Sequence, residues 1–155
     1  MLSVSETVIG PVGIEEDEGS ITRLFLPNKA GRIKDPGGEA TPLLAEAFRQ
    51  LDLYLEGKLH QFSLPLRPEG TDFMKRVWRE LLKVPYGRTT TYRELAVAAG
   101  SPGGSRAAGM ANAKNPIAIF IPCHRVIGSN GKLVGFGGGL ELKSWLLDLE
   151  AGNIE

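Results

Sequence analysis

The chain has 155 residues, of which 42% are hydrophobic, and it carries equal numbers of acidic and basic side chains. One cysteine excludes an internal disulfide and a cysteine-rich zinc site, which favours a reducing compartment. Neither an 18-residue apolar run nor a basic-then-apolar leader occurs, so we expect a globular, cytoplasmic protein without a membrane-spanning segment.

Charge is divided unevenly along the sequence. Residues 1–70 hold seven basic and eleven acidic side chains, a net charge of −4. Residues 71–140 hold ten basic and three acidic side chains, a net charge of +7. Such asymmetry indicates a polyanionic partner such as nucleic acid, although a solvated basic surface would give the same pattern.

The first sixty residues predict a small α/β unit. We expect short strands at 7–9 and 12–14 around a Gly10-Pro11 turn, an acidic loop at 15–19, a longer strand at 21–26 and a strand-like piece at 59–62. Thr41 and Pro42 are typical of a helix start, and an apolar stripe follows them at helical spacing. His60 has no cysteine or second histidine nearby, so we interpret it as a surface or structural residue.

A proline-rich stretch from Leu64 to Gly70 marks the boundary between two predicted domains. We predict an N-terminal α/β domain over 1–65, a linker over 66–71, and a second domain over 72–155. The second domain begins with a helix from about Thr71, which ends at Val84-Pro85-Tyr86-Gly87.

Two short helices joined by a tight turn follow. Thr91 and Glu94 form a capping-box pattern that opens the first helix, which closes at Gly100. The second is predicted from Ser101-Pro102 to about Asn112, so the pair matches a helix-turn-helix. Apart from Arg106, the second helix consists mainly of glycine and alanine. Tight packing inside the protein would explain these small residues, and so would close approach to another surface such as DNA.

The cysteine is followed directly by one of the two histidines, in Cys123-His124. The apolar run 117–121 predicts a buried strand that ends at Pro122 and presents the thiol at its end. A single cysteine is usually a small buried hydrophobic residue, and neighbours on an extended chain point to opposite faces. The pair therefore does not identify a nucleophile by itself.

The last thirty residues predict a turn at 128–131, a short strand at 132–134, a glycine-rich loop at 135–139 and a helix at 140–150. Four glycines in five residues indicate a backbone that a ligand approaches closely, although the sequence lacks the Gly-Lys-Ser/Thr of a phosphate loop. Lys143 and Glu150 share one stripe of the helix, so a cation and a carboxylate can face the same neighbouring site.

These motifs together resemble the O6-alkylguanine-DNA alkyltransferases, which move an alkyl group from guanine O6 to their own cysteine. The resemblance rests on Pro122-Cys123-His124-Arg125-Val126 and continues at the family's spacing from Tyr92 through Arg106, Asn115, the loop to Gly139, Lys143 and Glu150. It is specific over residues 71–155. Residues 1–65 match the family's N-terminal domain only by length and element order, and they lack the cysteines with which some relatives bind zinc. A related inactive branch replaces the nucleophile, which is present here as Cys123.

The resemblance implies a ribonuclease H-like N-terminal α/β domain and a mostly helical, winged-helix-like C-terminal domain. It also implies DNA repair by a monomer that flips the damaged base out of duplex DNA through the minor groove. One irreversible transfer from O6-alkylguanine would then consume each molecule, without a metal or organic cofactor. O4-alkylthymine stays open as a second substrate.

The resemblance also implies roles for individual residues. The catalytic group comprises Cys123, His124, Glu150, Asn115, Tyr92 and Lys143. Substrate contacts fall to Val126, Phe136, Gly137 and Met110. DNA contacts fall to Arg106, Thr91, Ala107, Ala108, Gly109 and Arg125. In this scheme Glu150 holds His124, which draws the proton from Cys123 through a water, and Arg106 fills the gap left by the flipped base.

Two other classes of function are considered. A DNA-binding module without catalysis would recognise lesions and recruit partners, but the complete Cys-His-Glu set argues against it. A papain-type hydrolase would also use cysteine and histidine, but it would leave the helix-turn-helix unexplained.

Overall fold

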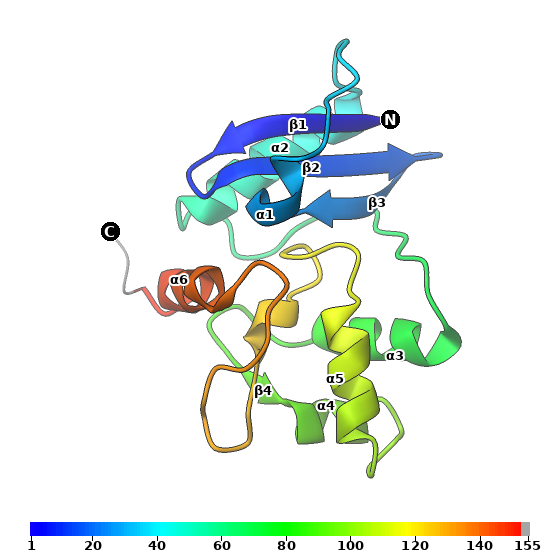
Figure 1. The fold of residues 1–155 in the computed structure, drawn as a ribbon, viewed down its shortest axis with the longest axis vertical. Coiled ribbons are helices and arrows are strands. Elements are labelled where there is room, and N and C mark those ends of the chain that lie inside the picture. The colour runs from blue at the N-terminus through cyan, green and yellow to red at the C-terminus, as the bar shows by residue number, and fades with distance from the viewer. Residues whose placement is uncertain (153–155) are drawn as a thin grey trace. The chain divides into compact units, whose positions relative to one another are not determined.

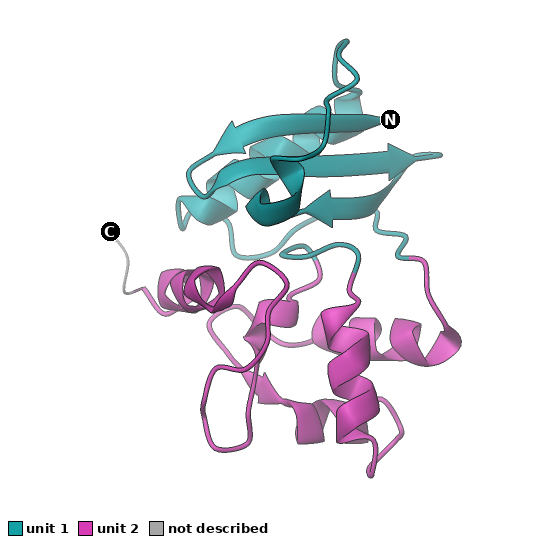
Figure 2. Ribbon diagram, in the orientation of Figure 1, with its two compact units in different colours: residues 1–68, 116–120 teal, residues 69–115, 121–155 magenta. Residues whose placement is uncertain are grey.

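The computed structural model describes residues 1–152 and forms two compact units (Figures 1 and 2). Unit 1 comprises residues 1–68 and 116–120, and unit 2 comprises residues 69–115 and 121–155. The chain therefore returns to unit 1 for five residues shortly before Cys123. Among the described residues, none of the helices combines the length and apolar character needed to cross a membrane.

Unit 1 is a three-stranded antiparallel sheet with a helix packed on it (Figure 1). The strands are β1 (Leu2–Thr7), β2 (Gly10–Asp17) and β3 (Ser20–Phe25), in the order β1-β2-β3. The helices are α1 (Pro27–Ala30) and α2 (Pro42–Leu55). As predicted, the Thr41 hydroxyl caps α2 by accepting from Leu44 N at 3.2 Å. The core is made by apolar residues of β2, β3 and α2, among them Val12, Ile14, Ile21, Leu44 and Leu51.

The turns of unit 1 lie elsewhere than the sequence predicts. The β1–β2 turn is formed by Val8 and Ile9, because Gly10 already belongs to β2 and pairs with Thr7. The acidic stretch is mostly strand, since β2 continues to Asp17 and only Glu18 and Gly19 turn with positive φ. The run of acidic residues suggested a loop, although Glu15 and Glu16 are half-buried strand residues and only Asp17 is exposed. Residues 59–62 do not form a strand.

The segment before the cysteine is not the predicted strand. Leu24 N donates to Pro116 O at 2.9 Å, and Leu24 and Ile117 form a single parallel bridge. The chain then turns, with Ile119 at a φ of 71°, which is uncommon for a β-branched residue. The prediction of a strand over 117–121 is wrong, because tertiary contacts outweigh the β propensity of these residues. Cys123 instead begins a short 3-10 helix, η1 (Cys123–Arg125).

Unit 2 is mostly helical. Its elements are α3 (Asp72–Leu81), β4 (Thr90–Thr91), α4 (Tyr92–Ala98), α5 (Ser105–Ala113), η1, β5 (Val126–Ile127) and α6 (Leu140–Glu150). Thr91 caps α4 as predicted, and Thr71, where the first helix of this domain was predicted to begin, caps α3. Helix α5 begins at Ser105, four residues later than predicted, because Gly104 N donates to Ser101 O and closes a separate turn first. The strand predicted at 132–134 does not form.

Packing of α3 against α5 anchors the helix-turn-helix pair. Val77, Trp78 and Leu81 form the buried side of α3. The indole N–H of Trp78 donates to Ala111 O at 2.8 Å in a buried environment. A buried indole needs such a partner, so this bond fixes α5 on α3.

Candidate functional site

Glu150, the last residue of α6, lies at the centre of a buried hydrogen-bond network. Its Oε2 accepts from His124 Nε2 at 2.6 Å and from Arg125 Nη2 at 3.0 Å. Its Oε1 accepts from Arg125 Nε at 2.8 Å and from Gly87 N at 3.2 Å. A buried carboxylate is costly unless it is paired and hydrogen-bonded, and here both oxygens have two donors.

His124 is fully buried and is oriented by this carboxylate. Because Nε2 donates to Glu150, the other ring nitrogen, Nδ1, is left as the basic one in the neutral ring. Burial lowers the pKa of His124, while the hydrogen bond and the charge of Glu150 raise it and the charges of Arg125 and Lys143 lower it. The result is a pKa below the ordinary value, so the ring is neutral near pH 7 and can accept a proton.

Arg125 lies differently from the predicted DNA contact. Its side chain is buried, with two donors on Glu150 and Nη1 donating to Val84 O at 2.8 Å. The guanidinium carbon is 5.8 Å from the centre of the Tyr86 ring. These contacts direct the guanidinium into unit 2 and toward the carboxylate.

The segment after α3, Val84 to Gly87, contacts the same pair of residues. Val84 supplies a carbonyl to Arg125, and Gly87 supplies an N–H to Glu150. Gly87 has a φ of 78°, and a Cβ there would stand 3.3 Å from the Glu150 backbone oxygen. Glycine is required here both by conformation and by the close approach of α6.

Cys123 is 6% exposed, and both its backbone N–H and its carbonyl are hydrogen-bonded. Its N–H donates to Ile121 O at 2.8 Å, and the same oxygen accepts from Asn115 Nδ2 at 2.8 Å. Its carbonyl accepts from Asn112 Nδ2, on α5, at 3.3 Å. Asn115 therefore braces the turn before the cysteine, and Asn112 ties the cysteine to the helix-turn-helix.

Tyr92 and Lys143 both lie within electrostatic range of Cys123. Burial raises the pKa of Tyr92, a hydrogen bond with Asn112 lowers it, and the charge of Cys123 raises it. The phenol therefore keeps its proton at neutral pH. Burial lowers the pKa of Lys143, and the charge of Cys123 opposes that change. The Lys143 ammonium donates to Val134 O at 2.7 Å.

A two-residue parallel pairing brings Tyr92 to the cysteine. Thr90 pairs with Val126 and Thr91 with Ile127, so β4 lies beside the strand that follows Cys123-His124-Arg125. Thr91 ends β4 and caps α4, with its hydroxyl accepting from Glu94 N at 3.1 Å. Tyr92 is the next residue, at the start of α4.

Helix α5 has one packed side and one exposed side. Ala108, Ala111 and Asn112 are buried, and a Cβ on Gly109 would touch the Tyr92 ring at 3.4 Å. Arg106, Ala107 and Met110 are exposed. Both interpretations of the small residues are thus supported on different sides: internal packing on one, and a surface that another molecule could approach on the other.

The predicted substrate contacts differ in how far they are buried. Val126 is fully buried in β5 beside the cysteine turn. Phe136 is half-buried, and Gly137 is exposed in the glycine-rich loop, with no described atom within 4 Å of the position of an added Cβ. Met110 is 55% exposed on α5. Gly137 of the loop and Met110 of α5 are therefore accessible to another molecule.

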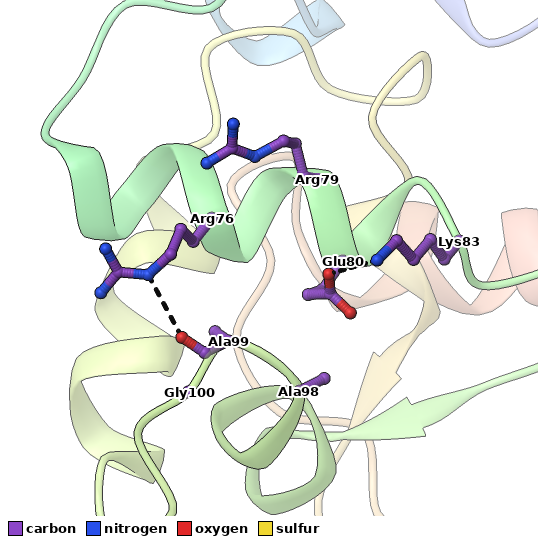
Figure 3. Close-up of a pocket in the computed structure, with 7 residues that line it drawn as sticks. All are labelled: Arg76, Arg79, Glu80, Lys83, Ala98, Ala99 and Gly100. Atoms are coloured by element: carbon purple, nitrogen blue, oxygen red, sulfur yellow. Dashed lines mark hydrogen bonds and ion pairs between the residues drawn. The ribbon is translucent and has the colours of Figure 1, made fainter.

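A hollow of about 660 Å³ lies between α3 and the end of α4 (Figure 3). It is lined by Arg76, Arg79, Glu80, Lys83, Ala98, Ala99 and Gly100. Arg76 Nε donates to Ala99 O at 3.3 Å, and Lys83 pairs with Glu80 at 2.7 Å (Figure 3). The first bond stabilises the end of α4, and the second lies at the end of α3. The hollow contains none of the predicted site residues. Within residues 1–152, no cluster of three or more His, Cys, Asp and Glu side chains could hold a metal ion.

Three residues of the network were missed or misinterpreted from the sequence. Asn112 is the one buried polar residue of α5, and its place four residues after the buried Ala108 could have revealed it. Gly87 was interpreted only as a helix breaker. Arg125 was assigned to DNA, because a basic residue in a basic region gives no sign of an internal carboxylate partner.

Known proteins of one family match the chain over nearly its whole length. Residues 72–152 match the family model for the 6-O-methylguanine DNA methyltransferase DNA-binding domain, and residues 2–68 match the model for its ribonuclease-like domain. The methylated-DNA–protein-cysteine methyltransferase of Methanosarcina barkeri is 50% identical over 154 residues, covering 97% of both chains. The constitutive enzyme of that name from Bacillus subtilis is 43% identical, covering 96% of this chain and 93% of its own.

Solved structures agree with this assignment. The crystal structure of Mycobacterium tuberculosis OGT in complex with DNA matches with a TM-score of 0.84 and 38% identity, covering 98% of this chain and 93% of that one. The M. tuberculosis O6-methylguanine methyltransferase matches with a TM-score of 0.82 and 40% identity, covering 100% and 96%. The expected fold class, a ribonuclease-like α/β domain followed by a helical DNA-binding domain, is confirmed.

Proposed function

Because the chain belongs to the 6-O-methylguanine DNA methyltransferase family, we propose that its alkyl acceptor is Cys123, activated by His124 and Glu150. The protein is a methylated-DNA–protein-cysteine methyltransferase that binds DNA and repairs O6-methylguanine in it. The observation that carries the proposal is the 2.6 Å bond between buried His124 and Glu150, directly beside the chain's one cysteine.

The first step is removal of the thiol proton. An ordinary thiol has a pKa of about 8.5, so only a few per cent of it is thiolate at neutral pH. His124 accepts that proton at Nδ1 through a water, while Glu150 holds Nε2 and stabilises the imidazolium that forms. His124, as the base, and Glu150, which orients it, thus act together to activate Cys123. Asn115 braces the turn that carries the thiol.

The thiolate sulfur then attacks the alkyl carbon. The S–C bond forms as the C–O6 bond breaks, and the electron pair passes to the guanine. Tyr92, which keeps its proton at neutral pH, donates to the departing ring, and Lys143 stabilises the thiolate before attack. Because a thioether offers no route back, one molecule repairs one base. O4-alkylthymine, which offers the same alkyl–oxygen bond, is a candidate second substrate.

The substrate base is held by the loop and the cysteine turn. The Gly137 N–H bonds O6, the carbonyls of Cys123 and Val126 read the exocyclic amine, and Phe136 and Met110 wall the base. The open space around Gly137 supports this arrangement.

The target atom is inaccessible in a duplex, so the base must leave the stack, at a cost of a few kcal/mol. The exposed side of α5 enters the minor groove with Ala107 and the half-buried Gly109 close to DNA, and Arg106 fills the vacated place. Ala108, predicted as a DNA contact, is fully buried and packs inside unit 2 instead. Thr91 lies at the edge of this surface. The concentration of basic residues after residue 70 supports DNA binding by residues 72–155. Residues 1–65 then form the smaller domain, a linker at 66–71 joins the two, and the protein acts as a monomer. A free thiol nucleophile supports a reducing, cytoplasmic location.

Intact-mass analysis tests the proposal. After incubation with duplex DNA containing O6-methylguanine, the protein should gain one methyl group, and peptide mapping should find it on Cys123. Cys123→Ser should remain unmodified and leave the lesion in place, while binding undamaged duplex as the parent does. A methyl group on any other residue would overturn the assignment.

A further inference from the structure

The Arg125–Glu150 pair has the geometry of a device that positions the catalytic carboxylate. Nε and Nη2 of Arg125 donate to different oxygens of Glu150, at 2.8 and 3.0 Å, so the fork holds the carboxylate in one plane. The Arg125 side chain is 8% exposed and that of Glu150 is 1% exposed. Water therefore does not compete for these bonds.

The guanidinium is itself held from its far side. Nη1 donates to Val84 O, and the Tyr86 ring lies beside the guanidinium carbon. Gly87, three residues after Val84, donates to the carboxylate. The arginine therefore links the end of α3 to the end of α6 while His124, the preceding residue in the chain, bonds the same carboxylate.

We propose that Arg125 is a positioning residue of the transfer reaction, which holds Glu150 against His124, and that it does not contact the DNA backbone. The inference rests on the proposed function of His124 and Glu150. The hydrogen bonds of the Arg125 side chain go to Glu150 and Val84, so it acts on the reaction through Glu150. A lysine at this position would keep the charge but lose the fork.

The charges that face His124 predict a distinctive pH dependence. Glu150 of α6 raises the pKa of His124, whereas Arg125 of η1 and Lys143 of α6 lower it, beyond the lowering by burial. Tyr86 and the Cys123 thiol are the other titratable groups near this network. Removal of the Arg125 charge should raise the pKa of His124, so the neutral base is lost at a higher pH. Removal of the Glu150 charge should lower that pKa.

The test compares Arg125→Met, Arg125→Lys and the parent protein. Transfer from free O6-benzylguanine is followed by intact mass across pH, because the free base needs neither DNA binding nor flipping. Arg125→Met should slow transfer by about tenfold or more. Losses of this size are typical when a residue that orients a metal-ligating side chain by a hydrogen bond is removed. The acidic limb of its pH–rate profile should move to higher pH. Arg125→Lys should recover part of the rate and keep the limb near its parent position.

Arg49→Met is the matched control. Arg49 makes the same two-bond contact with Glu46, at 2.7 Å for each bond, but on the exposed surface of α2. Its replacement should leave the rate and the pH profile unchanged. If Arg125→Met does not fold, the double variant Arg125→Met/Glu150→Gln replaces it, because it leaves no unpaired buried charge. Its transfer rate and pH profile are then compared with those of Glu150→Gln and Arg125→Lys.

Other outcomes separate the inference from the function on which it rests. If Arg125→Met transfers normally from the free base but binds undamaged duplex weakly, with a salt slope shallower by about one unit, Arg125 is a phosphate contact and the inference is wrong. An unmoved acidic limb in all Arg125 variants would also overturn it. If the parent protein itself gains no alkyl group on Cys123, the proposed function fails instead.

Discussion

The arginine in the Glu150 network and the arginine on the exposed side of α5 have opposite environments. Arg125 is buried against a carboxylate, a carbonyl and a tyrosine ring, so its charge is used inside the protein. Arg106 is exposed on a helix of small residues, so its charge is available to another molecule. Both arginines belong to the basic stretch between residues 71 and 140.

The comparison shows that net charge alone does not locate a DNA-binding surface. A basic residue contributes to binding a polyanion only when its donors are not already used within the fold. The two regions should therefore respond differently to substitution. Changes in the network should slow transfer from free base and duplex alike, whereas loss of Arg106 from the exposed side of α5 should affect only the duplex.

The largest effect is expected in the network, from Glu150→Gln. His124 loses the carboxylate that orients it and stabilises its protonated form, so transfer should slow about 100-fold or more on both substrates. The apparent pKa of the Cys123 thiol should rise. The pKa of His124 should fall further, because Glu150 raises it in the parent protein, and the acidic limb should move to lower pH.

Single-turnover rates on free O6-benzylguanine and on methylated duplex, measured across pH, check this prediction. The acidic limb should move to lower pH in Glu150→Gln and to higher pH in Arg125→Met. A general loss of structure would not move the limb in opposite directions in the two variants. An unchanged pH profile would mean that Glu150 takes no part in activating Cys123 through His124. Slowing confined to the duplex would contradict the distinction between the two regions.

An intermediate effect is expected on α5, from Arg106→Ala. Flipping costs a few kcal/mol, so repair of the duplex should slow roughly 10- to 100-fold even at saturating DNA. Transfer from the free base should stay within about twofold, as for an ordinary surface substitution. Stopped reactions at several DNA concentrations separate the rate from the affinity.

Two other results would reassign Arg106. A normal rate at saturation, with weaker binding and a shallower salt slope, would make it a phosphate contact only. Equal slowing on the free base and the duplex would mean that it supports the fold of α5.

The smallest effect is expected where the two regions meet, from Gly109→Ala. The added Cβ would lie 3.4 Å from the Tyr92 ring, an ordinary contact, and alanine should favour the helix by up to about 1 kcal/mol. Thermal unfolding should therefore shift slightly upward, with both transfer rates within about twofold of the parent. A large loss on the free base would instead show that Gly109 sets the position of Tyr92.

Local sequence signals determined much of unit 2. Thr91 was recognised as a cap because a hydroxyl before an apolar-periodic run is the usual solution for unpaired N–H groups at a helix start. The start of the preceding helix was predicted at about Thr71, which is its cap. The last helix, over 140–150, was likewise predicted from its period. The residues placed around the cysteine by the family resemblance, from Tyr92 to Glu150, could be found because their spacing is a property of the sequence.

Tertiary structure alone decided the rest. The predicted strand at 117–121 is a turn with a bridge to Leu24, which lies almost a hundred residues away in the sequence. Leu24 pairs with one residue of the segment, Ile117. The pairing of Thr90 with Val126, which brings Tyr92 to the cysteine, involves two residues on each strand and leaves no periodic pattern. The role of Arg125 was invisible because a charge in a sequence does not reveal whether its partner is water, DNA or a carboxylate from another helix. Burial decides that question, and burial is set by how α3, η1 and α6 pack together.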